Sequence, residues 1–141
     1  MTPLRIGYVA QLLGVSVDTV RKWVDDGSVR ATRTPSGHRE IDPAGLAEFL
    51  RESLNDASAS KGAEITKTLP ASSARNRFLG IVTNVTKDKV MASVEMIAGS
   101  FRIVSLMSSE ACDDLGLEPG VVAVASVKAT NMMIEVSKER I

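Results

Sequence analysis

Residues 10–23 read AQLLGVSVDTVRKW, a stretch that predicts two short helices joined by a tight turn. Gly14 is placed to end the first helix, and Ser16 has the hydroxyl of an N-cap for the second. The first helix extends upstream, where the apolar residues that share one face are Ile6, Val9, Ala10 and Leu13. This spacing is typical of a helix-turn-helix, whose second helix enters the major groove of DNA.

A short hairpin and a third helix are predicted next. Two strands, at residues 29–34 and 38–41, flank a Pro-Ser-Gly turn, and a helix is expected to begin at Pro43. Residues 28–39 carry three arginines and a histidine without any acid. The whole chain has 17 Lys and Arg against 17 Asp and Glu, but residues 1–41 hold six against four. Positive charge is therefore concentrated where a DNA-binding surface is predicted.

Three motifs of this part, taken in order, resemble the winged-helix DNA-binding domains of the MerR/excisionase superfamily. They are AQLLGVS, TVRKW and TPSGHR, which begin at residues 10, 19 and 34. The resemblance covers about residues 4–52 and implies a recognition helix at 16–26 and a wing that follows the phosphate backbone. The residues expected to contact double-stranded DNA are Ser16, Thr19, Arg21, Lys22, Arg33, Ser36, His38 and Arg39. Relatives usually continue into a dimerisation coiled coil, which this sequence lacks, so dimerisation is expected from elsewhere.

The composition changes between residues 56 and 71, where small and polar residues predict a flexible linker. The linker separates an N-terminal domain, residues 1–55, from a C-terminal domain, residues 72–141. Apolar and β-branched runs in the second domain predict strands at residues 78–86, 90–97, 101–107, 121–130 and 132–136. One short helix, capped by Ser108 or Ser109, is expected among them. These elements predict a small, closed, OB-like barrel that associates with copies of itself.

Polar side chains of the second domain form a candidate anion site. The sequence Ser-Ala-Arg-Asn begins at Ser73, before the first predicted strand, and Ser108 stands at the predicted helix start. Lys128 and Thr130 are predicted on one face of a strand. Such hydroxyl, amide and cationic groups suit an oxyanion, because hydrogen bonds to a charged acceptor are the stronger kind. The residues alone do not identify which anion is bound.

The order of these segments resembles the Mop domain, also called TOBE, over about residues 72–137. The motifs are SARN, the segment 106–117, Pro-Gly at 119–120 and Lys-Ala-Thr at 128–130. The resemblance implies paired OB-like barrels that hold molybdate or tungstate between subunits. It places Ser73, Arg75 and Asn76 on one side of the site, and on the other Ser108 and Lys128, with Thr130 as a neighbour. Many members carry a second hydroxyl three residues after Ser108, where this sequence has Ala111.

Several classes of protein are not expected. The sequence offers no nucleophile–base pair, metal cluster or phosphate loop, so neither an enzyme nor a catalytic cofactor is expected. The chain has one cysteine, Cys112, which predicts a small buried residue rather than a metal ligand. No apolar run approaches the ~20 residues that span a bilayer, and no secretory signal begins the sequence. A cytoplasmic protein without a membrane partner is therefore expected.

The sequence as a whole predicts a two-domain protein, a small α winged helix-turn-helix followed by an all-β OB-like barrel with one short helix. The interpretation is a homo-oligomeric transcriptional regulator that binds DNA in response to molybdate or tungstate. One alternative is an intracellular molybdate or tungstate storage or buffering protein with a non-regulatory N-terminal module. A second alternative is a constitutive architectural DNA-binding protein whose barrel serves only for oligomerisation.

Overall fold

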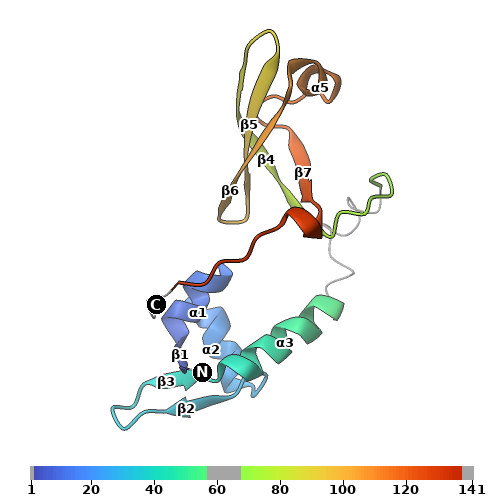
Figure 1. Cartoon of the computed structure of the whole chain (residues 1–141). Helices are drawn as coiled ribbons and strands as arrows, with labels where there is room; N and C mark the ends of the chain where they lie inside the picture. Colours follow the sequence, from blue (N-terminus) through green and yellow to red (C-terminus); the bar gives the residue numbers. More distant parts are fainter. Residues whose placement is uncertain (1, 57–67, 138–141) are drawn as a thin grey trace. The chain divides into compact units, whose positions relative to one another are not determined.

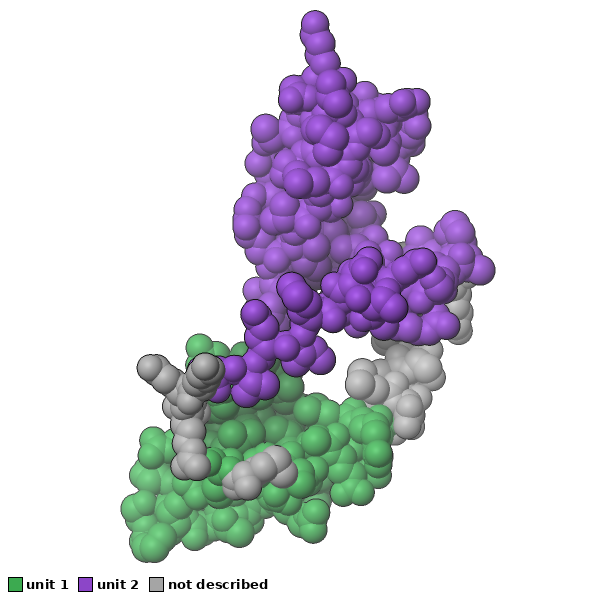
Figure 2. All heavy atoms as spheres, in the orientation of Figure 1, with its two compact units in different colours: residues 1–64 green, residues 65–141 purple. Residues whose placement is uncertain are grey.

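The computed structural model describes residues 2–56 and 68–137. The chain divides into two compact units, Met1–Glu64 and Ile65–Ile141, which Figure 2 colours separately. The linker predicted at residues 56–71 falls mainly on residues 57–67, which lie outside the described residues. Each unit has its own hydrophobic core and is described by itself.

Unit 1 combines helices with a small antiparallel sheet (Figure 1). Its elements are β1 (Leu4–Arg5), α1 (Ile6–Leu13), α2 (Val17–Asp25), β2 (Ala31–Arg33), β3 (Arg39–Ile41) and α3 (Pro43–Asp56). Strand β3 lies in the middle of the sheet and pairs with β1 on one side and β2 on the other. The hairpin β2–β3 is the wing, and α1 and α2 form the predicted helix-turn-helix.

The turn between α1 and α2 is built by the two residues that the sequence singles out. Gly14 adopts a left-handed conformation with φ 65°, where its missing side chain avoids a steric penalty. The Oγ atom of Ser16 accepts a hydrogen bond of 3.1 Å from the backbone N–H of Thr19 and so caps α2. The start of the second helix of the helix-turn-helix is therefore confirmed at the predicted position.

The core of unit 1 joins all its elements. The buried residues are Val9, Ala10, Val20, Val29, Ile41 and Leu46. Trp23 packs against this core, with its ring centroid 5.0 Å from that of Phe49 in α3. Because the apolar side of α2 packs in the core, the polar side of this helix faces solvent.

Unit 2 is an antiparallel half-barrel with one short helix (Figure 1). Its elements are β4 (Asn76–Lys87), β5 (Met91–Ala98), β6 (Phe101–Ser108), α5 (Ser109–Asp114), β7 (Val122–Val127) and the 3₁₀ helix η2 (Ala129–Asn131). The sheet order is β6-β5-β4-β7. The N-terminal half of β4 pairs with β7 and the C-terminal half pairs with β5. The core residues are Val82, Ala92, Val94 and Cys112, and the predicted burial of Cys112 is confirmed.

The C-terminal part of unit 2 departs from the sequence prediction in three ways. The strand predicted at residues 121–130 ends at Val127, and Lys128 is the N-cap of η2, so Lys128 and Thr130 do not share a strand face. Residues 132–136 form no strand within the described chain. The edge strands β6 and β7 are not paired with each other among the described residues, so the barrel is half-open rather than closed. Val127 pairs with Asn76, the first residue of β4, and beyond this pair the sheet offers no further partner.

Candidate functional sites

The first candidate site is the exposed side of α2 together with the wing. Of the eight residues predicted to contact DNA, four belong to the start and middle of α2 and four to the hairpin β2–β3 and its turn. None of the eight is buried, and only Thr19 and Arg39 are half-buried. The structure therefore presents the predicted residues to solvent from two neighbouring parts of one unit.

A hollow of about 550 Å³ lies where these two parts meet. Its lining includes Arg21 of α2 and, from the wing, His38 and Arg39. Arg5 also lines it, from the position immediately before α1. Sequence patterns did not point to Arg5, although a cation beside the unsatisfied N–H groups of a helix start is a signal for an anion. Three arginines thus line the hollow together with one acid, Asp25 of α2, and arginine side chains suit the phosphates of a nucleic acid.

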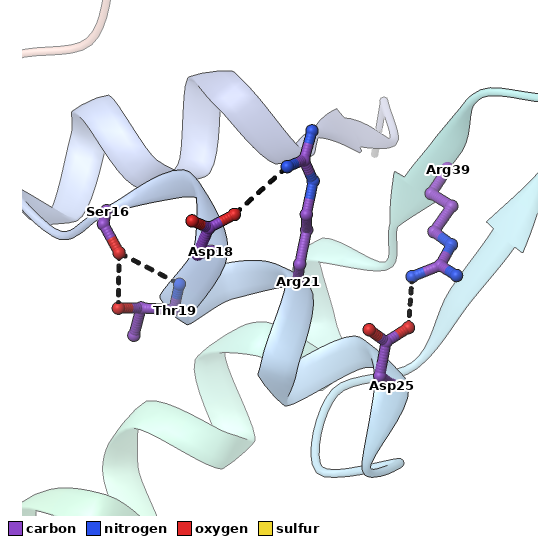
Figure 3. A network of polar contacts seen from close by, with 6 residues as sticks. All are labelled: Ser16, Asp18, Thr19, Arg21, Asp25 and Arg39. Carbon is purple, nitrogen blue, oxygen red and sulfur yellow. Dashed lines mark hydrogen bonds and ion pairs between the residues drawn. The ribbon is translucent and has the colours of Figure 1, made fainter.

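Two arginines of this surface are paired with acids of α2 (Figure 3). Nη1 of Arg21 lies 3.1 Å from Oδ1 of Asp18, one helical turn away. Arg39 of the wing forms an ion pair with Asp25, near the end of α2. Within the described residues, no acid lies at ion-pair distance from Arg33. Arg21 and Arg39 are therefore held in ion pairs by acids of the same unit, whereas Arg33 is not.

The turn of the wing is closed by its own polar groups. The backbone N–H of Thr34 donates to the carbonyl of His38 at 2.8 Å, and Gly37 has φ 83°. The hydroxyls of Thr34 and Ser36 lie 2.9 Å apart, and the N–H of His38 donates to the Thr34 hydroxyl. Ser36 is thus engaged in the turn, while His38 keeps its imidazole exposed.

The junction between α2 and the wing is also fixed by hydrogen bonds. The backbone N–H and the hydroxyl of Ser28 both donate to Oδ1 of Asp26, at 3.0 and 2.5 Å. The hydroxyl bond and then the N–H bond hold the pKa of Asp26 below its usual range. The carboxylate that closes this junction is therefore ionised at neutral pH.

The second candidate site lies at one end of the half-barrel. Asn76 opens β4 and pairs with Val127, the last residue of β7, and its side-chain amide donates to the Val127 carbonyl at 3.3 Å. Lys128 follows directly, so it lies beside Asn76. Ser73, Arg75, Lys128 and Thr130 are exposed, and Arg75 donates to the Ser72 carbonyl at 3.3 Å. Five of the six predicted oxyanion-binding residues are thus close to one end of the sheet.

Ser108 lies at the opposite end. It pairs with Met91 of β5, and the neighbouring residue Ala92 pairs with Lys87, the last residue of β4. At about 3.3 Å per residue, the 12 residues of β4 span on the order of 35 Å. Within one chain, Ser108 therefore cannot share a small anion with Asn76, and Lys128 groups with Asn76 rather than with Ser108.

Ser108 serves as the N-cap of α5. Its Oγ atom accepts a hydrogen bond of 3.1 Å from the backbone N–H of Ala111. This bond uses the N–H at the position where many relatives of the resembled family carry a second hydroxyl. The hydroxyl proton of Ser108 is left to donate to a ligand.

No group of three or more His, Cys, Asp or Glu that could hold a metal ion occurs in the described parts of the chain. No helix there is long and apolar enough to cross a membrane. The Sγ atom of Cys112 is buried, 3.9 Å from the Leu117 carbonyl oxygen.

Comparisons with known proteins separate the chain into the same two parts. The model of the TOBE domain matches residues 72–134, and the model of the MerR family regulatory protein matches residues 5–41. Molybdenum-pterin-binding protein 3 of Clostridium pasteurianum is 40% identical over 63 residues, which are 44% of this chain and 93% of that protein. Molybdenum-pterin-binding protein 1 of the same organism is 36% identical over the same lengths.

Two solved structures are similar to unit 2. A molybdate-binding protein from Sporomusa ovata is 31% identical, covers 48% of this chain and is itself covered completely, with a TM-score of 0.46. MopII from Clostridium pasteurianum is 37% identical, covers 47% of this chain and is also covered completely, with a TM-score of 0.44.

Proposed function

The chain belongs to the TOBE domain family through residues 72–134 and carries a MerR-family region at residues 5–41, and on this basis we propose that it is a molybdate- or tungstate-responsive transcriptional regulator. The observation that carries the proposal is the presence of both regions in one chain. The matched families are binding and regulatory rather than enzymatic. The relatives of unit 2 are named for binding molybdenum-pterin or molybdate, which supports an oxyanion ligand.

The oxyanion is bound between two copies of the chain. One copy supplies the end of the sheet that carries Asn76 and Lys128, together with Ser73, Arg75 and Thr130. The second copy completes the site with Ser108 of the partner subunit. The length of β4 supports this arrangement, because it keeps the two groups of donors apart within one chain. A dianion held by several hydrogen bonds and two cations is then stabilised by charge-assisted contacts from both subunits.

Self-association of the half-barrel is supported by apolar side chains that unit 2 leaves in solvent. Phe101 is 66% exposed, Leu106 71%, Val122 63% and Ile134 89%. Phe101 and Leu106 belong to the edge strand β6 and Val122 to the edge strand β7, so both edges of the half-barrel carry apolar side chains that a second copy can cover. A second copy that covers these residues gains hydrophobic free energy, so the functional form is a homo-oligomer.

DNA binding belongs to unit 1. The contacting residues are Ser16, Thr19, Arg21, Lys22, Arg33, Ser36, His38 and Arg39, with Arg5 added from the hollow. The helix α2 enters the major groove and the wing follows the backbone. Because the chain is neutral overall, non-specific attraction to DNA is modest and tight binding depends on two linked units. An oxyanion that favours the dimer therefore raises DNA affinity through linkage, in the cytoplasm where both ligands occur.

Titration calorimetry of the full chain with molybdate, tungstate and sulfate tests the ligand. Molybdate and tungstate are expected to bind, and Lys128→Ala is expected to weaken binding about tenfold, as loss of a charged hydrogen bond implies. Arg51→Ala is the control, because Arg51 is an exposed cation of α3 in unit 1 and belongs to neither candidate site. Equal losses in both variants would remove Lys128 from the site.

Fluorescence anisotropy with duplex DNA, with and without saturating molybdate, tests the regulation. The expected result is tighter DNA binding with molybdate. Oxyanion binding without any affinity for DNA would favour the storage protein. DNA binding without any affinity for the oxyanions would favour the architectural protein.

A further inference from the structure

The wing and the recognition helix are joined by an ion pair between side chains. Arg39, the first residue of β3, pairs with Asp25, the last residue of α2 (Figure 3). The Arg39 side chain is 32% exposed, whereas Arg21, the other paired arginine of this surface, is 59% exposed. Arg39 is thus the more firmly packed of the two and the less available to a ligand from solvent.

The register of the wing explains why an acid is needed at this point. Arg33 of β2 and Arg39 of β3 are directly opposite each other in the antiparallel pair. Side chains in such a pair project from the same face, and like charges directly opposite destabilise the hairpin. The carboxylate of Asp25 compensates one of the two charges. Arg33 remains exposed, with no acid at ion-pair distance in the described chain.

The outer part of the wing receives little support from the rest of the sheet. The strands β2 and β3 share three residue pairs, and the Arg33–Arg39 pair is the one nearest the turn. Strand β1 supports β3 only at Ile41 and Glu40, so it does not reach Arg39. Two-stranded ribbons are marginal without further packing. The hydrogen bonds of the turn close the hairpin on itself, whereas the contact between Asp25 and Arg39 links it to α2.

We propose that the Asp25–Arg39 ion pair sets the angle of the wing against the recognition helix, so that Arg39 is a positioning residue and Arg33 is the arginine that contacts the DNA backbone. This inference rests on the proposed DNA-binding function and assigns different roles to Arg33 and Arg39 within that surface. It differs from a direct role for Arg39, in which Asp25 would only compete with phosphate for the guanidinium group.

The two roles predict opposite effects of Asp25→Asn. This change removes a negative charge from a DNA-facing surface, so a competing acid would give tighter binding and a steeper dependence of affinity on salt. A positioning pair gives weaker binding, by about two- to fivefold, which is the effect of losing a partly exposed ion pair. The salt slope stays unchanged, because the number of neutralised phosphates is the same.

The matched control is Asp18→Asn. It removes an acid of the same helix and releases Arg21, but it touches no residue of the wing. DNA affinity is expected to rise in this variant. The probe is a fluorescein-labelled duplex selected from a random-sequence pool by the wild-type full chain, titrated between about 50 and 200 mM salt. Tighter binding by Asp25→Asn, with a steeper slope, would overturn the proposal.

A second measurement does not depend on DNA. Nuclear magnetic resonance relaxation of the backbone amides of Gly37 and His38 is expected to report greater mobility in Asp25→Asn than in the wild type, and no change in Asp18→Asn. Equal mobility in all three proteins would refute the positioning role even if DNA binding were intact. If instead no duplex is enriched from the pool while wing mobility changes as expected, the proposed DNA-binding function fails and the ion pair remains a structural support.

Discussion

Replacement of Gly80 by alanine is expected to destabilise unit 2 strongly. A Cβ atom at Gly80 would lie 2.3 Å from the carbonyl oxygen and 2.9 Å from the carbonyl carbon of Ile97, inside the 3.0 Å that real Cβ atoms respect. Overpacking typically costs 1–3 kcal/mol. The obstacle here is backbone of β5, which cannot move without disturbing the pairing of Ile97 with Ile81, so we expect about 3 kcal/mol. That is a large share of the stability of an ordinary domain.

Urea unfolding followed by two signals isolates this effect. The single tryptophan, Trp23, belongs to unit 1, so its fluorescence reports that unit, while far-ultraviolet circular dichroism also includes the sheet of unit 2. Gly80→Ala should lower the midpoint of the sheet transition and leave the fluorescence midpoint unchanged. Gly7→Ala is the control: its Cβ meets nothing within 4 Å, and alanine favours α1 by up to about 1 kcal/mol. An unshifted sheet transition in Gly80→Ala would refute the argument from close approach.

Three further predictions concern the two units separately. Arg33→Ala should reduce the slope of log affinity against log salt by about one, measured by anisotropy with the selected duplex, and an unchanged slope would exclude a phosphate contact. Asp88 accepts hydrogen bonds from the N–H groups of Met91 and Val90, which hold the pKa of its carboxyl below its usual range. Its contribution to stability is therefore present above the ordinary aspartate pKa of about 4 and is lost as the pH falls through the lowered pKa. Urea midpoints of Asp88→Asn should therefore depend less on pH in this acidic range than those of the wild type; parallel curves would contradict this. Ile134→Glu should shift the chain toward monomer in sedimentation velocity, because it replaces an exposed apolar side chain of the proposed interface by a charged one. An unaltered distribution of sedimentation coefficients would exclude Ile134 from the interface.

The parts of the fold that could be predicted are those set by local chemistry. Ser16 and Ser108 cap their helices because a short hydroxyl side chain can reach the free N–H groups of the first turn. Alternation along residues 90–97 correctly predicts a strand, β5, in which Ala92, Val94 and Met96 are buried. In each case the signal and its effect lie within a few residues.

The parts that could not be predicted depend on partners far along the chain. Nothing in the sequence after Val127 marks the end of β7, which is set by the start of β4 at Asn76. Apolar residues at 132–136 indicate a strand, but a strand also needs a neighbour to pair with. Asp25 and Arg39 are separated by 14 positions, and only the fold brings their charges together. The positioning role proposed for Arg39 therefore could not be predicted from the sequence.

The division of the proposed oxyanion donors between the two ends of β4 has a consequence for the cell. The proposed site, completed by a partner subunit, exists only in proportion to the fraction of chains that are assembled, so the molybdate level that triggers the proposed response falls as the protein becomes more abundant. Expression level then adjusts the sensitivity of the sensor without any change in its residues. A regulator built in this way would respond to the dose of its own gene as well as to the metal supply.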